Sequence, residues 1–132
     1  MKKLDRTFAV LMFLGGIGHG IGCYKAYGND HMTLLWAWSA SLFVFLLAGV
    51  NLLRAGRMED RPLAWLSLGG CIAWAACAVW FGQLIGNLLD FRALGNLIIA
   101  TVLAIFSMRS LPRSGKAERV QGDLSAARAE NA

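Results

Sequence analysis

The stretch TLLWAWSASLFVFLLAGVNLL, residues 33–53, decides the fold, because it contains no charged residue. A transmembrane α-helix needs about 20 mainly apolar residues to cross ~30 Å of hydrocarbon at 1.5 Å per residue. The apolar residues run continuously and do not alternate with polar ones, which excludes a membrane β-strand. Lipid offers the backbone no hydrogen-bond partners, and a helix satisfies its own. We therefore predict a transmembrane helix over residues 33–53.

Charged turns separate this stretch from three similar ones, which predict helices over residues 7–24, 62–81 and 91–108. Pro62 opens one of them at a position where its missing N–H costs nothing. The last is slightly short, which flanking residues or local bilayer thinning accommodate. Composition agrees, since 57% of the 132 residues are hydrophobic and 16% are charged, against about 25% charged in soluble domains. The predicted fold is all-α: an integral membrane four-helix bundle over residues 1–110.

Basic residues lie mainly on one side of the predicted bundle, and the net charge is +5. That side holds Lys2, Lys3, Arg6, Arg54, Arg57, Arg61, Arg109, Arg113, Lys116 and Arg119, with Arg128 further along. The other side holds Lys25 and Arg92. Short loops rich in lysine and arginine stay in the cytoplasm. We therefore expect both termini in the cytoplasm (N-in/C-in) and the chain in a plasma membrane, namely the bacterial inner membrane.

The partners that this charge distribution predicts are membrane lipids, including anionic headgroups at the basic side. No basic face with interleaved aromatic residues lies outside the predicted helices, so we expect no nucleic-acid partner.

The two ends of the chain differ in character. Residues 111–132 form a polar tail without aromatic residues, which we expect to be cytoplasmic and disordered. The start combines basic residues, an apolar run and Cys23, which is similar to a bacterial lipoprotein signal. The usual leucine three positions before the cysteine is Gly20 here, and His19 interrupts the apolar run, so a retained first helix is favoured.

Residues 15–23, GGIGHGIGC, contain two overlapping GxxxG patterns. Small residues let helix backbones approach closely in lipid, so they predict helix packing; the alternative is a ligand groove or a flexible helix. The predicted packing residues are Gly15, Gly16, Gly18, Gly20, Gly22, Gly69 and Ala73. Similar stripes recur at three- and four-residue spacing on the other helices: Ala37, Ser41, Ala48 and Asn51; Gly69, Ala73 and Cys77; and Asn96, Ala100, Ala104 and Ser107.

One polar or polarisable side chain from each helix falls at a similar depth, counted at 1.5 Å per residue from the basic side. These candidate ligand-binding residues are His19, Ser41, Trp74, Cys77 and Asn96. An ionisable residue inside the membrane, such as His19, is a functional-site hypothesis by default. The alternative, which we favour, is that neutral His19 hydrogen-bonds Ser41 or Asn96 and locks the bundle.

Metal and enzyme chemistry have little support in the sequence. His19 and Cys23 lie one helical turn apart and are weak candidates for copper or zinc, but two ligands are too few. Three cysteines without a CxxC pattern predict neither a disulfide framework nor a zinc site. We predict no cofactor. An enzyme is the least favoured class, because no nucleophile–base pair or carboxylate pair is evident.

The function we expect is that of a binding or accessory protein. It would act as an assembly component, through homo-oligomerisation or by docking on a larger membrane complex. The alternative is a small transporter or carrier of an apolar or neutral solute that uses the polar layer around His19. Small-residue faces left without a neighbour after the four helices pack would favour the first function. An open cavity at the His19 layer would favour the second.

Overall fold

The protein is an integral membrane bundle of four α-helices, as the sequence predicts. The computed structural model describes residues 2–111 and contains no strand in that range. Its helices are α1 (Lys2–Tyr27), α2 (His31–Gly56), α3 (Arg61–Leu84) and α4 (Phe91–Ser110). Each is long and apolar enough to cross a membrane. The tail predicted to be disordered lies, from residue 112 on, outside the described residues.

All four helices are longer than predicted, and α1 shows the largest difference. It begins at Lys2 instead of residue 7, and α2 continues to Gly56 instead of residue 53. The predicted ends lie where charged residues begin. A helix can continue past the hydrocarbon, however, because charged side chains near its ends reach water or each other.

An aspartate caps each of the last three helices. The carboxylates of Asp30, Asp60 and Asp90 accept hydrogen bonds from backbone N–H groups in the first turns of α2, α3 and α4. Such caps satisfy N–H groups that have no partner inside the helix. The hydrogen bonds from Thr33 also lower the pKa of Asp30, and those from Arg92 lower the pKa of Asp90 to about 2.

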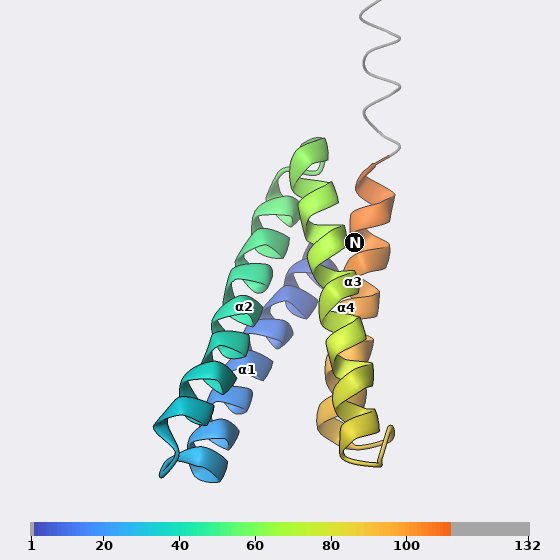
Figure 1. Cartoon of the computed structure of the whole chain (residues 1–132). Coiled ribbons are helices and arrows are strands. Elements are labelled where there is room, and N and C mark those ends of the chain that lie inside the picture. The colour runs from blue at the N-terminus through green and yellow to red at the C-terminus, as the bar shows by residue number, and fades with distance from the viewer. Residues whose placement is uncertain (1, 112–132) are drawn as a thin grey trace, which may run out of the picture.

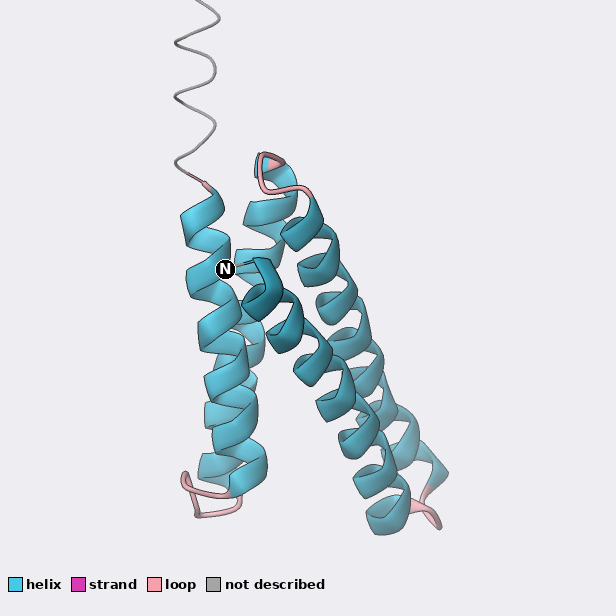
Figure 2. Ribbon diagram, turned by 180° about the vertical axis from the view of Figure 1, so that it is seen from behind, coloured by secondary structure: helices cyan, strands magenta, loops and turns pink. Residues whose placement is uncertain are grey.

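The helices form two antiparallel hairpins, α1–α2 and α3–α4, which lie side by side (Figure 1). We call the end with the start of α1, the α2–α3 loop and the end of α4 the basic end. The opposite end, with the α1–α2 and α3–α4 loops, is the hairpin end. Figures 1 and 2 show the hairpins close together at the basic end and diverging toward the hairpin end.

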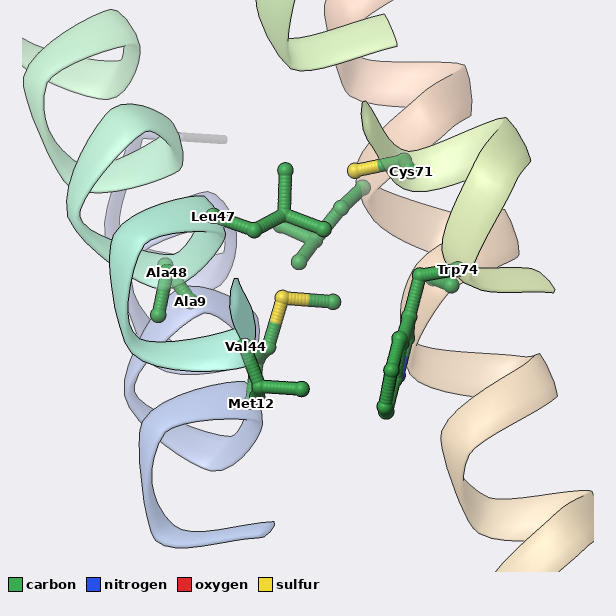
Figure 3. Close-up of a cluster of buried hydrophobic side chains, with 9 residues drawn as sticks. Ala9, Met12, Val44, Leu47, Ala48, Cys71 and Trp74 are labelled. Carbon is green, nitrogen blue, oxygen red and sulfur yellow. The ribbon is translucent and has the colours of Figure 1, made fainter. Parts of the chain in front are cut away.

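The core that joins the hairpins lies in the middle of the bundle and toward the basic end. Figure 3 shows Met12, Val44 and Leu47 pointing from the first hairpin toward Cys71 and Trp74 of α3. The buried cluster consists of Ala9, Met12, Val44, Leu47, Ala48, Cys71, Trp74, Ala100 and Leu103. Large apolar side chains elsewhere point outward, as a surface in lipid requires.

The structure confirms close packing at three of the predicted glycines. A Cβ atom on Gly16 would lie 2.7 Å from Cε1 of Phe45, so a side chain there would displace the Phe45 ring or separate α1 from α2. A Cβ on Gly20 would lie 3.5 Å from Oγ of Ser41, and one on Gly15 would lie 4.0 Å from Oδ1 of Asn96. The first GxxxG pattern thus packs α1 on α2.

The packing prediction is wrong, within this chain, for the other four residues. A Cβ atom on Gly18, Gly22 or Gly69 would meet nothing within 4 Å, and Ala73 is exposed. Two residues rotate a helix by about 200°, so the second GxxxG pattern points away from the α2 contact that the first one makes. The same rotation separates Gly69 and Ala73 from the buried side of α3, which contains Ser67, Cys71 and Trp74.

Candidate functional site

Of the two contacts predicted for His19, with Ser41 or with Asn96, the structure contains the one with Ser41. Nδ1 of His19 lies 2.9 Å from Oγ of Ser41, a hydrogen-bond distance. Ser41 is buried and His19 is half-buried. The close approach of Gly20 to Ser41 explains the geometry, because the absent side chain lets the hydroxyl reach the α1 surface. The predicted hydrogen bond is therefore present, whereas a ligand-binding role for it stays a prediction.

Trp74 and Asn96 form a second polar contact, between α3 and α4. Nε1 of Trp74 donates to Oδ1 of Asn96 at 3.1 Å, and Nδ2 of Asn96 donates to the backbone oxygen of Arg92 at 2.7 Å. Gly15 of α1 lies opposite Asn96. No hydrogen bond among the described residues links this pair to His19 and Ser41, so the predicted layer consists of two separate pairs.

Cys77, the fifth residue of the predicted layer, does not belong to it. Its thiol is exposed on the outward side of α3 that also carries Ala73. Trp74 and Ala78 are buried and face inward. Viewed along the helix axis, Cys77 is rotated about 60° from Trp74 and about 100° from Ala78, toward the outward side. Counting depth alone could not detect this difference in direction.

Cys23 lies near His19, with its Sγ atom 3.6 Å from Nδ1 and 3.7 Å from Nε2. These two residues were the weak metal candidates. No group of three or more histidine, cysteine, aspartate or glutamate residues within 2–111 is arranged to hold a metal ion. Two ligands alone would leave a zinc or copper ion without its usual coordination.

The sequence suggests no nucleophile–base pair. In the structure, however, Ser41 and His19 lie at the hydrogen-bond distance that such a pair requires. A catalytic pair also needs a group that orients the imidazole. The Cys23 sulfur lies 3.7 Å from Nε2 of His19, and no carboxylate of the described chain bonds the ring. The contact joins α1 to α2.

A buried ion pair, which the sequence interpretation missed, lies at the basic end. Nη2 of Arg54 donates to Oδ1 of Asp5 at 2.5 Å, joining α2 to α1. The Arg54 side chain is 0% exposed and that of Asp5 is 6% exposed. A charge removed from water is stable only when it is paired and hydrogen-bonded, and this pair meets both conditions.

Four neutral side chains complete the network around Arg54. Its Nε donates to Oγ of Ser67 on α3 at 3.1 Å, and its Nη1 lies 3.4 Å from Oγ of Ser110 on α4. Ser67 in turn lies 2.9 Å from Oδ1 of Asn51 and 2.7 Å from Oγ of Ser107. Every buried side-chain nitrogen and oxygen in the described chain has a partner. One network thus bonds all four helices together.

The sequence contained a signal for this network that the predicted helix ends concealed. The stripe on α2 that includes Asn51 continues, three residues later, to Arg54. The stripe on α4 continues in the same way from Ser107 to Ser110. Asp5 is the one acidic residue in the basic start of the chain. Asp5 and Arg54 both lie just outside the predicted helices, which cover residues 7–24 and 33–53.

A scan against protein-family models finds no match to this chain, and searches of curated proteins and of solved structures find none either. A function for the chain is therefore inferred from its own residues and their geometry.

Proposed function

We propose that this protein is a membrane assembly component that binds a further transmembrane helix through small-residue faces that its own fold leaves unpacked. The observation that carries the proposal is the second GxxxG pattern. Gly18 and Gly22 lie within the membrane-spanning part of α1, and a Cβ on either would meet nothing within 4 Å. Spacing of this kind lets two helices approach closely in lipid, where small residues drive association through backbone contact.

The position of these glycines adds support. Gly15 lies opposite Asn96 of α4, and Gly18 and Gly22 follow on the same side of α1, closer to the hairpin end. There the two hairpins diverge (Figure 2), so this side of α1 loses its neighbour. A further helix could pack against it without displacing an existing contact.

A similar face lies on α3, where Gly69 and Ala73 are exposed between two exposed tryptophans, Trp65 and Trp80. Tryptophans favour the two membrane interfaces. The small residues between them therefore lie within the hydrocarbon, where another transmembrane helix can contact them. With unpacked small faces on α1 and α3, the partner we favour is a second copy of the chain. Docking on a larger membrane complex is the other outcome.

The test is native mass spectrometry of the protein purified from its membrane into lipid nanodiscs. We expect a discrete oligomer for the wild type, and monomers for a Gly18→Leu/Gly22→Leu variant whose helix content and thermal midpoint are unchanged. A co-purifying membrane protein that the same variant loses would identify the larger complex instead.

Gly49→Leu is the matched control, because Gly49 on α2 also has nothing within 4 Å of an added Cβ but lies outside both small faces. It should leave the oligomer intact. A wild type that is monomeric and free of partners, or a control that dissociates the assembly equally, would contradict the proposal.

A carrier of an apolar or neutral solute is the second candidate. It is favoured by the polar side chains of His19 and Asn96, which are only half-buried within the bundle. A carrier must expose this layer to water from one side at a time. An Asn96→Cys variant without the native cysteines would then react with a membrane-impermeant thiol reagent from each side in turn, whereas an assembly component would stay unreactive.

We further propose that the chain resides in a plasma membrane, as in the bacterial inner membrane, with the basic end in the cytoplasm. The support is the asymmetry of lysine and arginine between the two ends, which sets orientation over short loops. At the hairpin end the described basic residues are Lys25 and Arg92, and Asp90 pairs with Arg92 at 2.9 Å.

A further inference from the structure

An apolar groove of about 500 Å³ runs along the outward side of the seam between α1 and α2. Gly16 and Gly20 form its floor, because they have no side chains, and Ile21, Trp38 and Phe45 rise beside them. The polar side-chain groups of Trp38 and Ser41, which line the groove, are already bonded. Nε1 of Trp38 donates to the backbone oxygen of Gly20 at 3.2 Å, and Ser41 bonds His19. The groove therefore offers apolar contact, and it faces lipid.

A second depression, of about 490 Å³, lies at the hairpin end around the α1–α2 loop. Its lining includes Lys25, Asn29 and Asp30, and Tyr24 lines both this depression and the apolar groove. The two therefore adjoin at Tyr24, and the lining of the depression is more polar than that of the groove. Tyrosine and tryptophan at the junction are typical of a membrane interface.

The polar depression contains one charge of each sign. The structure records no ion pair between Lys25 and any residue within 2–111, so its ammonium is available to an anion. The Asp30 carboxylate accepts hydrogen bonds from the backbone N–H and the hydroxyl of Thr33. It retains further lone pairs, since an ionised carboxylate can accept about four hydrogen bonds. A ligand that carries both a phosphate and a primary ammonium would match this pair of charges.

We propose that the groove and the depression together bind one phospholipid with an ethanolamine headgroup, from the leaflet at the hairpin end. One acyl chain lies in the groove, the phosphate contacts Lys25 and the ammonium contacts Asp30. The groove has a suitable length: Gly16 and Tyr24 are about 12 Å apart along α1, and one leaflet of hydrocarbon is about 15 Å deep. A glycerol headgroup offers Asp30 no cation, and a choline headgroup has no N–H to donate.

The test uses the full chain in nanodiscs that contain equal amounts of ethanolamine, glycerol and choline phospholipids with identical acyl chains. Native mass spectrometry counts the lipids that stay bound after the disc is removed. We expect the wild type to retain one ethanolamine lipid in preference to the other two, by about fivefold, as expected for one exposed ion pair.

Three substitutions separate the parts of the site. Leu42→Trp fills the groove, whose lining includes Leu42, and should abolish retention of every headgroup. Lys25→Gln should weaken all three lipids. Asp30→Asn keeps a residue that caps helices well and should remove the preference for ethanolamine while leaving lipid bound. Leu46→Trp, on an exposed position of α2 outside the groove, is the matched control and should retain lipid as the wild type does.

Equal retention of the three lipids by the wild type would overturn the proposal, as would a preference for the anionic glycerol lipid. A Leu42→Trp variant that retains the lipid would overturn the assignment of the acyl chain to this groove. The assay does not depend on self-association, because bound lipid is counted for each copy of the chain.

Discussion

At the scale of single residues, the buried ion pair of Asp5 and Arg54 joins α1 to α2, and Arg54 also bonds Ser67 of α3. Removing one partner leaves the other charge buried without its counter-ion, which typically costs about 3–5 kcal/mol. We expect Asp5→Asn and Arg54→Met each to destabilise the protein by this amount. The double variant should lose much less than the two single variants combined, because it leaves no unpaired charge.

The measurement is a double-mutant cycle on the free energy of unfolding, obtained by denaturant titration in mixed micelles and followed by circular dichroism. Lys2→Gln is the control, since Lys2 is exposed near the start of α1. Strictly additive effects would show that the ion pair contributes no coupling.

His19 should have a smaller effect if it serves to link helices. Membrane hydrogen bonds between helices contribute about 0.6–2 kcal/mol, so we expect His19→Leu to destabilise the protein within that range. Ser41→Ala should cost a similar amount, with little added by combining the two changes, because both remove the 2.9 Å contact. His31→Leu, at an exposed position, should be neutral. Additive losses for His19 and Ser41 would argue against the link.

At the scale of helices, the glycine-rich segment of α1 has two faces: Gly16 lies on the face packed against α2, and Gly18 lies on a face without a neighbour. Gly16→Leu should lower the thermal midpoint of the monomer in detergent, because even a Cβ would come within 2.7 Å of Phe45. Gly18→Leu should leave that midpoint nearly unchanged, because its side chain would enter open space. Equal midpoints for the two variants, measured by circular dichroism, would show that the faces of α1 are wrongly assigned.

At the scale of the whole molecule, the arrangement of charges predicts the orientation in the membrane. A reporter enzyme fused after Ala132 should be active in the cytoplasm, and one inserted near Asn29 should report the opposite side. The reason is the excess of lysine and arginine at the basic end. A tail accessible only from outside the cell would refute this orientation and, with it, the proposed leaflet of the lipid site.

The sequence by itself determined the number of helices and their membrane character, because both depend on the length of uncharged runs. It also predicted that His19 contacts Ser41 or Asn96, since helix depth follows from a constant rise per residue, and the structure has the first of these contacts. It did not reveal which face of each helix turns inward. Gly16 and Gly18 look alike in the sequence, and the helix rotation between them decides that one packs on Phe45 and the other on nothing.

Only the tertiary structure decided where the charges near the helix ends go. Lysine, arginine and aspartate beside an apolar run ordinarily lie in water, and that expectation holds for Lys2 and Arg92. For Asp5 and Arg54 it fails, because two helices whose charges are 49 positions apart in the chain meet at one depth. Burying the two charges as a pair then costs less free energy than burying either charge without its partner. Such a meeting depends on how α1 packs against α2, which no local pattern of residues records.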